Sequence, residues 1–452
     1  THIMTPYPSF SWVMHSKYSD DFQSAYQIIV GKDLAKLKTG IGDVWDSKKT
    51  AGNNNLHLKY KGAALSPNST YYWSVKVWNK NGEESVWSAP QKFKTGQVTD
   101  SYFTETYPLE KKEEQAPVFV KKNATSYFLD FARDAFGTIK ITVNGVTSPD
   151  TLEIRLGEKL GGPDSISVKP GASIRFRKIP LPLQPGVSTY TLVIPHDKKN
   201  YTEESIHMPD YIGEVVPFRY CEIKKCKYPL TAAQVKRVAD YYHFNDHMSS
   251  FISSDTVLNR VWNLCKYSIK ATSFMGLYID GDRERMPIES DAYINQLCHY
   301  GIDREYSMAR KTHEYLIKKA THSTENIMHS VLIAWNDYMY TGNRESLIEF
   351  YTDLTHKTLY KLQREDGLIS SQSPNLTEDF LKTIHAQRLS DLIDWPSQER
   401  DGNEMMPVNP VINAFHYRAL VLMANIAKVT GNYHDTIKYS KMAEKVKQSF
   451  QK

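Results

Sequence analysis

The spacing of apolar residues changes once along this chain, near residue 250. Before that point apolar and polar positions alternate, as in the stretch YYWSVKVW that begins at Tyr71. After it, Leu258, Trp262, Cys265 and Ile269 recur at i, i+4, i+7 and i+11. Alternation is typical of strands and the longer spacing of helices, so the sequence predicts an N-terminal half of strands followed by helices.

The β half is predicted to form two sandwich domains, residues 1–97 and 98–248. In the first, short strands at 25–30, 56–60 and 71–78 are followed by Asn81-Gly82, which suits the positive φ of a tight turn. In the second, turn-rich stretches such as Gly161-Gly-Pro-Asp164 separate short alternating runs. These runs are residues 127–131, 138–143, 191–194 and 218–223.

Residues 249–452 are predicted to be helices and their connecting loops. Gly342, Gly367 and Gly431 mark helix ends, because glycine readily adopts the left-handed conformation found there. The predicted helices span residues 254–271, 292–300, 304–319, 327–340, 346–362, 411–428 and 433–450. Helices of this length joined by loops suit a toroid of helical hairpins.

The composition bounds the number of domains and argues against one class of partner. The 452 residues, 40% of them hydrophobic, allow two to four domains with proper cores. The 29 tyrosines and 8 tryptophans offer many aromatic faces of the kind on which sugars stack, although most must serve the core. A net charge of +5 without a long basic block argues against nucleic acid as a partner.

The four cysteines indicate neither a metal nor a redox site. They form no CxxC pair and have no histidine at zinc-finger spacing, so we expect buried free thiols and predict no cofactor. A Cys221–Cys226 disulfide is disfavoured, because the residues between them have the pattern of a strand. We also predict no membrane span, since no run approaches roughly 18 apolar residues, and the chain starts without a signal-peptide pattern.

The strongest chemical signal is the acidic run from Tyr278 to Asp291. It crowds five carboxylates around two arginines: Asp280, Asp282, Glu284, Glu289, Asp291, Arg283 and Arg285. Like charges at this density raise at least one carboxyl pKa, which makes that carboxyl a candidate general acid.

A simpler interpretation is that Glu289 and Asp291 complement a helix N-terminus. Pro287 suits a first helical position, and acidic residues favour the first turn. That interpretation explains Asp280 and Glu284 poorly, because both precede the proline and should lie in a loop.

The segment that begins at Asp280 reads DGDRERMPIESDAYINQLCHYGIDREYSMARKTHEYL. It resembles the acidic signature of bacterial α-L-rhamnosidases, which are inverting glycoside hydrolases with an (α/α)6 barrel. Further similar segments follow in the expected order: WNDYMYTGN from Trp335, IDWPSQERDG from Ile393, and VNPVINAFHYRAL from Val408. PSFSW, YYWSVKVWN and SVWSAPQKFKTG resemble the fibronectin-III-like module that opens this family. The resemblance implies a jelly-roll-like sandwich for 98–248 and part of the barrel for 249–452.

The resemblance also implies roles for individual residues. Glu284 matches the general acid, with a surface ion pair to a neighbouring arginine as the alternative. Asp280 and Asp291 match acids that bind sugar hydroxyls, and Arg283 would orient a carboxylate or hydroxyl. Trp395 matches a position whose indole packs on the deoxy sugar.

Four further positions are candidates for the same site. Trp335 is a substrate-binding candidate, although a tryptophan on an apolar helix is equally expected in the core. Glu399 and Arg400 follow Trp395 and would line the site opening unless they belong to a solvated charged loop. Glu325 lies in a segment without the expected aromatics. The longer family loop has a tryptophan where this chain has Ile288, so that stacking contact is absent or moved.

The chain departs from the family in the number of helices. An (α/α)6 barrel needs twelve, whereas seven are predicted, and the second catalytic carboxylate is expected on a later hairpin, beyond Lys452. We therefore expect an incomplete barrel.

The leading hypothesis for the function is the release of terminal α-L-rhamnose from glycans or glycosides without a metal. The alternatives are a non-catalytic carbohydrate-binding fragment and a different (α/α)6 carbohydrate-active enzyme. The resemblance favours a periplasmic or secreted location, and no oligomeric state is predicted.

Overall fold

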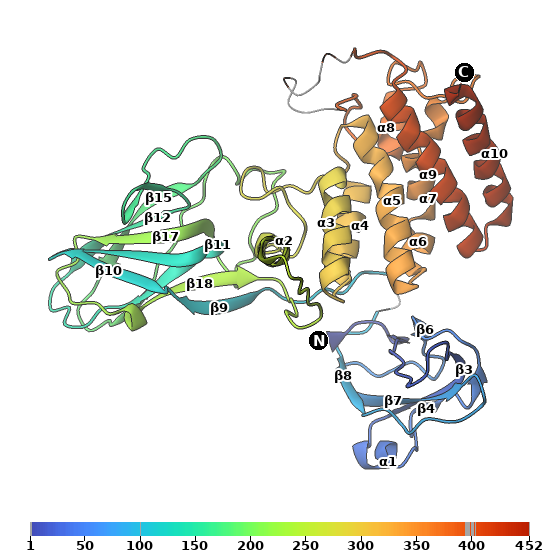
Figure 1. Ribbon diagram of the computed structural model, residues 1–452, viewed down its shortest axis with the longest axis horizontal. Helices are drawn as coiled ribbons and strands as arrows, with labels where there is room; N and C mark the ends of the chain where they lie inside the picture. The colour runs from blue at the N-terminus through green and yellow to red at the C-terminus, as the bar shows by residue number, and fades with distance from the viewer. Residues whose placement is uncertain (1, 100, 394–397, 399–401, 403, 452) are drawn as a thin grey trace. The chain divides into compact units, whose positions relative to one another are not determined.

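The computed structural model describes residues 2–99, 101–393, 398, 402 and 404–451. Strands occupy the first half and helices the second, in the predicted order (Figure 1). Two compact units are formed, and each draws on separate parts of the chain. The first contains residues 1–105, 334–352 and 422–440, and the second contains 106–333, 353–421 and 441–452. The division into domains 1–97, 98–248 and 249–452 stays a proposal.

A six-stranded sheet organises the N-terminal residues of the first unit. Its strands run in the order β1 (His2–Ile3), β8 (Gln91–Thr95), β7 (Thr70–Asn79), β3 (Gln23–Gly31) and β4 (Trp45–Asp46), with β5 (Thr50–Ala51) also on β3. A separate pair joins β2 (Ser9–Phe10) to β6 (Leu58–Lys59), and a short helix α1 spans Leu34–Lys38. Alternate side chains of the central strands, among them Ile28, Val30, Tyr71 and Val75, are buried together.

The turn predicted at Asn81-Gly82 is present. Gly82 has φ of +80°, and its amide donates to the carbonyl of Asn79 at the end of β7. Glycine adopts this left-handed conformation without the steric cost that a Cβ would bring.

The second unit begins with an eight-stranded antiparallel sheet. Its order is β15 (Phe176–Leu183), β12 (Asp150–Gly157), β17 (Val216–Lys224), β11 (Ser126–Thr142), β18 (Val235–Tyr241) and β9 (Glu110–Gln115). Strands β10 (Val118–Asn123) and β16 (Thr189–Thr191) pair with the two ends of β11, while β13 (Leu160–Gly162) and β14 (Ser165–Ile166) form a hairpin. Buried aliphatic side chains of β11, β12, β15 and β17 share one core.

Strand β11 contains a large bulge. Asp130 pairs with Tyr220 and Ala135 with Phe218, so the four residues 131–134 face Arg219 alone. Ala132 takes a left-handed φ of +67° within this segment. Bulges break the alternation of a strand and redirect its side chains, and they are common beside active sites.

The helices match the prediction in place, with some different bounds. They are α2 (Thr256–Thr272), α3 (Glu289–Ile302), α4 (Ser307–Lys318), α5 (Thr324–Thr341), α6 (Glu345–Glu349), α7 (Tyr351–Lys357), α8 (Glu378–Thr383), α9 (Pro410–Val429) and α10 (Tyr433–Phe450). The single helix predicted at 346–362 is broken into α6, α7 and a 3-10 turn, where Leu359 has φ of +59°. The short α8 was not predicted, because six residues give too little periodicity.

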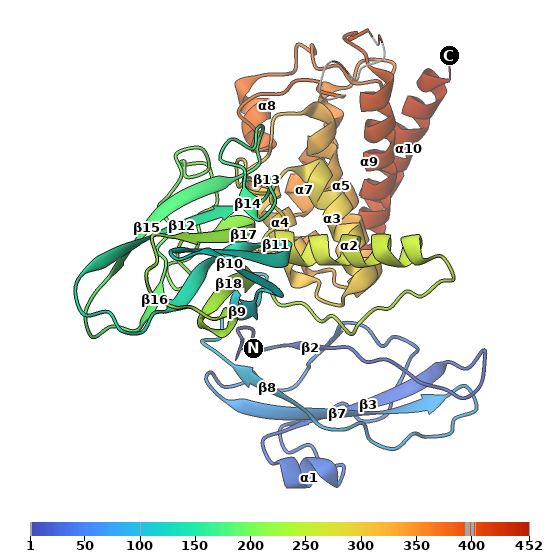
Figure 2. The same cartoon turned by 60° about the vertical axis from the view of Figure 1, so that its left-hand side comes forward.

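The apolar stripe of α2 is not a continuous core face. Leu258 and Cys265 are exposed, whereas Ile269 and Ala271 near the C-terminal end are buried. Helix α2 packs beside β11 and α3, and Figure 2 shows it next to the end of that strand. Spacing thus predicted the helix correctly, but it did not show how little of the helix is covered.

The cysteines are all free, as predicted, but only Cys221 and Cys226 are buried; Cys265 and Cys298 are exposed.

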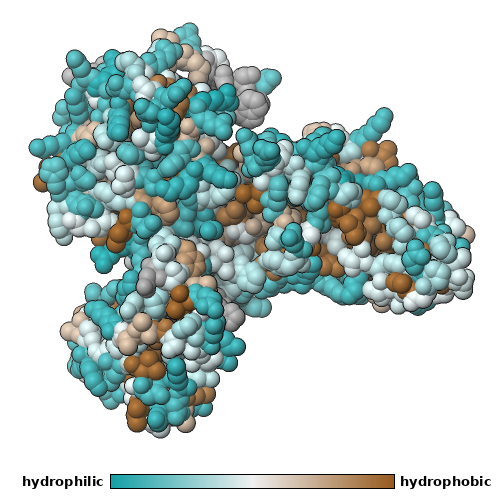
Figure 3. Space-filling model, turned by 180° about the vertical axis from the view of Figure 1, so that it is seen from behind, coloured by the Kyte–Doolittle hydropathy of each residue, from teal (hydrophilic) through white to brown (hydrophobic). Residues whose placement is uncertain are grey.

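The face in Figure 3 is mainly hydrophilic, and its apolar side chains form separate patches. Among the described residues, every helix is too short or too polar to cross a membrane.

Candidate active site

The acidic run forms a tight loop between α2 and α3. A hydrogen bond from the Asp280 amide to the Met286 carbonyl (3.1 Å) closes it, and residues 280–285 form its tip. Gly281 and Arg285 both have left-handed φ angles, +50° and +54°. This conformation is costly for an arginine, and strained backbone of this kind is concentrated at functional sites.

Three of the predicted site residues meet at this tip. Arg283 Nη2 lies 2.5 Å from Asp280 Oδ2, and its Nε lies 2.7 Å from Glu284 Oε1. The bond with Glu284 is the main cause that raises the pKa of Arg283. The Glu284 side chain is 45% exposed, so this carboxyl is accessible and is also engaged in the ion pair that the sequence offered as an alternative role.

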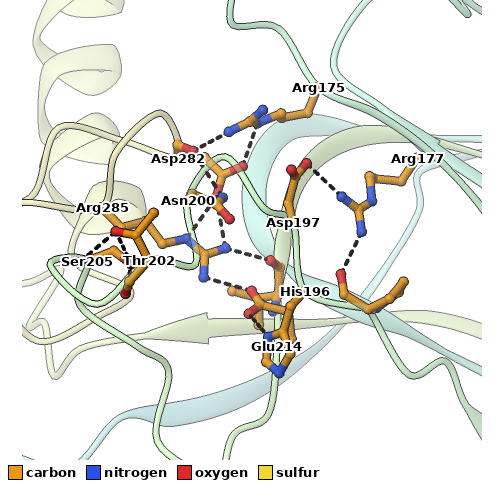
Figure 4. Close-up of polar contacts among 12 residues, drawn as sticks. Arg175, Arg177, His196, Asp197, Asn200, Thr202, Ser205, Glu214, Asp282 and Arg285 are labelled. Atoms are coloured by element: carbon orange, nitrogen blue, oxygen red, sulfur yellow. Dashed lines mark hydrogen bonds and ion pairs between the residues drawn. The ribbon is translucent and has the colours of Figure 1, made fainter.

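The other two charged residues of the tip point into the protein (Figure 4). Arg285, whose side chain is 1% exposed, lies between Asp282 (2.8 Å) and Glu214 (2.7 Å). Asp282 also pairs with Arg175 at 2.6 Å and accepts a hydrogen bond from Asn200 at 2.8 Å. These residues form a buried ion network that fastens the loop to the β-sandwich.

Sequence reasoning did not find Arg175, Asn200 or Glu214, because each lies more than 60 residues before the loop along the chain. The same network holds the strained Arg285 backbone, since its guanidinium also donates to the Val215 carbonyl at 3.0 Å. Buried charges are costly unless they are paired, so the loop has little freedom to move without exposing or unpairing them.

Glu289 and Asp291 both lie in the first turn of α3, as the helix-terminus interpretation predicted. Glu289 is fully buried; it accepts hydrogen bonds from the Thr321 amide (3.1 Å) and hydroxyl (2.5 Å), and burial raises its pKa. Asp291 is open to solvent, yet partial desolvation and then the charge of Asp280 raise its pKa. Glu289 is therefore structural, whereas Asp291 shares an electrostatic environment with the loop tip.

The environment of the Glu325 side chain differs from that expected for a substrate-binding residue. Its buried carboxylate accepts hydrogen bonds from the amides of Ile393 (2.9 Å) and Leu392 (3.5 Å). Ile393 has φ of +60°, an unusual conformation for a β-branched residue. Glu325 therefore holds the backbone that leads to Trp395. Trp395, Glu399 and Arg400 themselves lie outside the described residues.

Trp335 lies on α5 and is partly buried. Its indole packs against the ring of Tyr338, with centroids 5.4 Å apart. This contact is of the kind expected in a core, and the role of Trp335 in binding stays a prediction.

Within the residues that the structure describes, no group of three or more His, Cys, Asp or Glu side chains is arranged to hold a metal ion.

Replacing Glu325 by alanine should loosen the segment that precedes Trp395. Two hydrogen bonds from amides to a carboxylate would be lost, and each contributes roughly 1–3 kcal/mol. Hydrogen exchange at the amides of Leu392 and Ile393 should therefore accelerate at least about tenfold. Glu325→Gln keeps an acceptor oxygen and should show a smaller change. Equal exchange in the wild type and in Glu325→Ala would contradict this anchoring role.

In this chain β-rich regions precede a helical region, and an acidic loop joins the first two helices of that region, α2 and α3. Residues 246–452 match the bacterial alpha-L-rhamnosidase 6 hairpin glycosidase domain, and residues 1–99 match the Rha78A-like N-terminal immunoglobulin domain. Both matched regions are thus of the type found in bacterial α-L-rhamnosidases, as the sequence motifs indicated.

Curated relatives share short stretches of sequence. An alpha-L-rhamnosidase from Formosa agariphila is 41% identical over 98 residues, which is 22% of this chain and 10% of the relative. One from Streptomyces avermitilis is 41% identical over 90 residues, 20% of this chain and 8% of the relative. The matched stretches thus span about a tenth of the length of these relatives.

Solved structures match the whole chain in fold. The alpha-L-rhamnosidase from Dictyoglumus thermophilum has a TM-score of 0.72 at 14% identity, covering 100% of this chain and 71% of that protein. The Streptomyces avermitilis enzyme complexed with L-rhamnose has a TM-score of 0.73 at 12% identity, covering 100% and 76%. The predicted fold class, β-sandwich regions followed by helices of an (α/α)6 barrel, is confirmed.

Proposed function

We propose that this protein removes terminal α-linked L-rhamnose from glycans or glycosides, with inversion at the anomeric carbon. The matches to the two rhamnosidase family models support the reaction class. The observation that supports a site in this chain is the linked set at the loop tip, Asp280–Arg283–Glu284, which the buried network holds in place.

The roles follow from inverting hydrolysis. Glu284 donates a proton to the glycosidic oxygen as its bond to the anomeric carbon breaks. A second carboxylate, on the opposite face of the sugar, takes a proton from the attacking water. We assign no residue of this chain to that base. Arg283 orients Glu284 through the 2.7 Å ion pair.

The remaining candidates would bind the sugar. Asp280 and Asp291 accept hydrogen bonds from its hydroxyls, which are strong when the acceptor is charged. Trp395 and Trp335 provide apolar surface for the methyl group of the 6-deoxy sugar. Glu399 and Arg400 are candidates for the opening, and Glu325 acts by holding the segment before Trp395.

Hydrolysis of p-nitrophenyl α-L-rhamnoside, followed by proton NMR, tests the reaction and its stereochemistry. We expect β-L-rhamnose to form first and the α anomer to appear later by mutarotation. Initial release of α-L-rhamnose would contradict inversion. Absence of hydrolysis would contradict the activity of this chain.

One observation favours a second function, non-catalytic carbohydrate binding. Glu284 is half exposed and paired with Arg283, an environment that suits a carboxylate acceptor as well as an acid. Calorimetric titration with L-rhamnose beside the hydrolysis assay separates the two functions. Binding without turnover supports the binding module, and binding with turnover supports the enzyme.

A further inference from the structure

Lys357, the last residue of α7, is a fully buried lysine outside the proposed catalytic loop. Its ammonium group donates a hydrogen bond to the Ile384 carbonyl at 2.7 Å. Lysine is almost never fully buried unless its charge is paired, because taking a charge out of water is costly. The position of Lys357 therefore requires an opposite charge nearby.

Glu289, the first residue of α3, supplies this opposite charge and is likewise fully buried. Burial raises the pKa of Glu289, and the charge of Lys357 opposes this rise. Burial lowers the pKa of Lys357 to about 8, and the charge of Glu289 opposes this fall. Each buried charge thus stabilises the other, and removal of one leaves its partner uncompensated.

The carboxylate at the start of α3 is also bonded to the connection between α4 and α5, at Thr321. On either side of Thr321 this connection binds a segment that follows α8. The Ala320 amide donates to the His385 carbonyl at 3.2 Å, and the His322 carbonyl accepts from the Ser390 amide at 2.9 Å. Hydrogen bonds therefore link the start of α3, the connection and the segment in series.

This segment, residues 384–393, leads to Trp395 and is held at both ends. Lys357 binds the carbonyl of its first residue, and Glu325 binds the amides of its last two. The buried pair thus acts on the segment twice, directly through Lys357 and through the α4–α5 connection from Glu289.

We propose that Lys357 and Glu289 are positioning residues for the sugar, because their buried charge pair fixes the first turn of α3, which carries Asp291, relative to segment 384–393. This inference rests on the proposed function, in which Asp291 and Trp395 bind the rhamnosyl unit. Both members of the pair are fully buried, so neither touches the sugar. They act through the backbone that carries the binding residues, and their loss weakens binding more than it slows proton donation by the general acid.

The test uses Lys357→Met, which keeps an unbranched side chain and removes its charge. We expect the Kd for L-rhamnose, measured by calorimetry, and the KM for p-nitrophenyl α-L-rhamnoside to rise about tenfold. The kcat should stay within about threefold, because the ion network of Arg285 holds the catalytic loop independently. A fall in kcat without a change in Kd or KM would overturn the positioning role.

Two comparisons separate positioning from a general loss of stability. Lys357→Met/Glu289→Gln buries no uncompensated charge, so it should recover at least about threefold of the affinity lost in Lys357→Met. Leu354→Ala is the matched control, because Leu354 is fully buried on the same helix. Its cavity should lower the thermal midpoint, while the Kd for rhamnose stays within about twofold. An equal loss of affinity in Leu354→Ala would overturn the inference, and so would a double variant without recovery.

Thr321→Val tests the same link without leaving a charge uncompensated. Removal of the hydroxyl bond to Glu289 should raise the Kd and the KM about threefold and leave kcat unchanged. Unchanged affinity in this variant and in Lys357→Met would overturn the inference.

A measurement without substrate separates this inference from the proposed function. In Lys357→Met the amides of Ala320 and Ser390 should exchange with solvent at least about tenfold faster than in the wild type, since both join the connection to the segment. Unchanged exchange would overturn the positioning role and leave the proposed function standing. Faster exchange in a protein that neither binds nor hydrolyses rhamnosides would reject the proposed function, and with it the role in binding.

Discussion

Glu284→Gln is expected to lower kcat/KM for a rhamnosyl disaccharide about a thousandfold, within the range of roughly 10²–10⁴ that general acid catalysis contributes. Glutamine keeps the shape and the hydrogen bond to Arg283 but has no proton to donate to the glycosidic oxygen. The measurement is steady-state hydrolysis of rutinose by the wild type and the variant.

The leaving group provides the internal control for this role. p-Nitrophenolate departs without protonation, so the loss for p-nitrophenyl α-L-rhamnoside should be much smaller, about tenfold. Glu203→Gln, at an exposed position, should stay within about twofold of wild type on both substrates. Equal losses on the two substrates would assign Glu284 to binding, and undiminished turnover would remove it from the site.

The second large effect is on stability. Arg285→Met should lower the free energy of unfolding by roughly 3–5 kcal/mol, because it leaves the buried carboxylate of Glu214 without its arginine and removes one of the two arginines of Asp282. In a thermal unfolding experiment this corresponds to a midpoint lower by roughly 3–8 °C for a protein of this size. The loop tip should also become disordered, so hydrolysis should fall even at temperatures where the variant is folded.

Two comparisons test whether the unpaired charge causes this loss. Arg388→Met removes an exposed arginine and should change stability by less than about 0.5 kcal/mol. The double variant Arg285→Met/Glu214→Gln should be more stable than Arg285→Met alone, since it no longer buries a carboxylate whose remaining side-chain partner is His196, at 2.9 Å. If Arg285→Met were as mild as Arg388→Met, the network would not be what holds the loop.

The local parts of the site could be predicted from the sequence. Asp280, Arg283 and Glu284 lie within five residues, so any tight loop brings them together, and the structure pairs them. The start of α3 was signalled by Glu289 and Asp291, which lie in its first turn. Pro287 does not take the first helical position expected of it, because the helix begins at Glu289, three residues earlier than its periodicity indicated. The sequence could not show which charged residues of the acidic cluster point outward and which point into the protein, because side chains in a loop do not alternate between two faces.

What the sequence determined by itself is the order of elements, two β-rich regions and then helices, together with the family signature and the acidic loop. These follow from spacing over a few residues, where backbone geometry decides which side chains share a face. Only the tertiary structure decided that Arg175 and Glu214 fasten the loop, and that Glu325 and Lys357 hold the chain before Trp395. The physical reason is that burial and ion pairing depend on residues far apart in the chain, and their partners are chosen by packing rather than by local pattern.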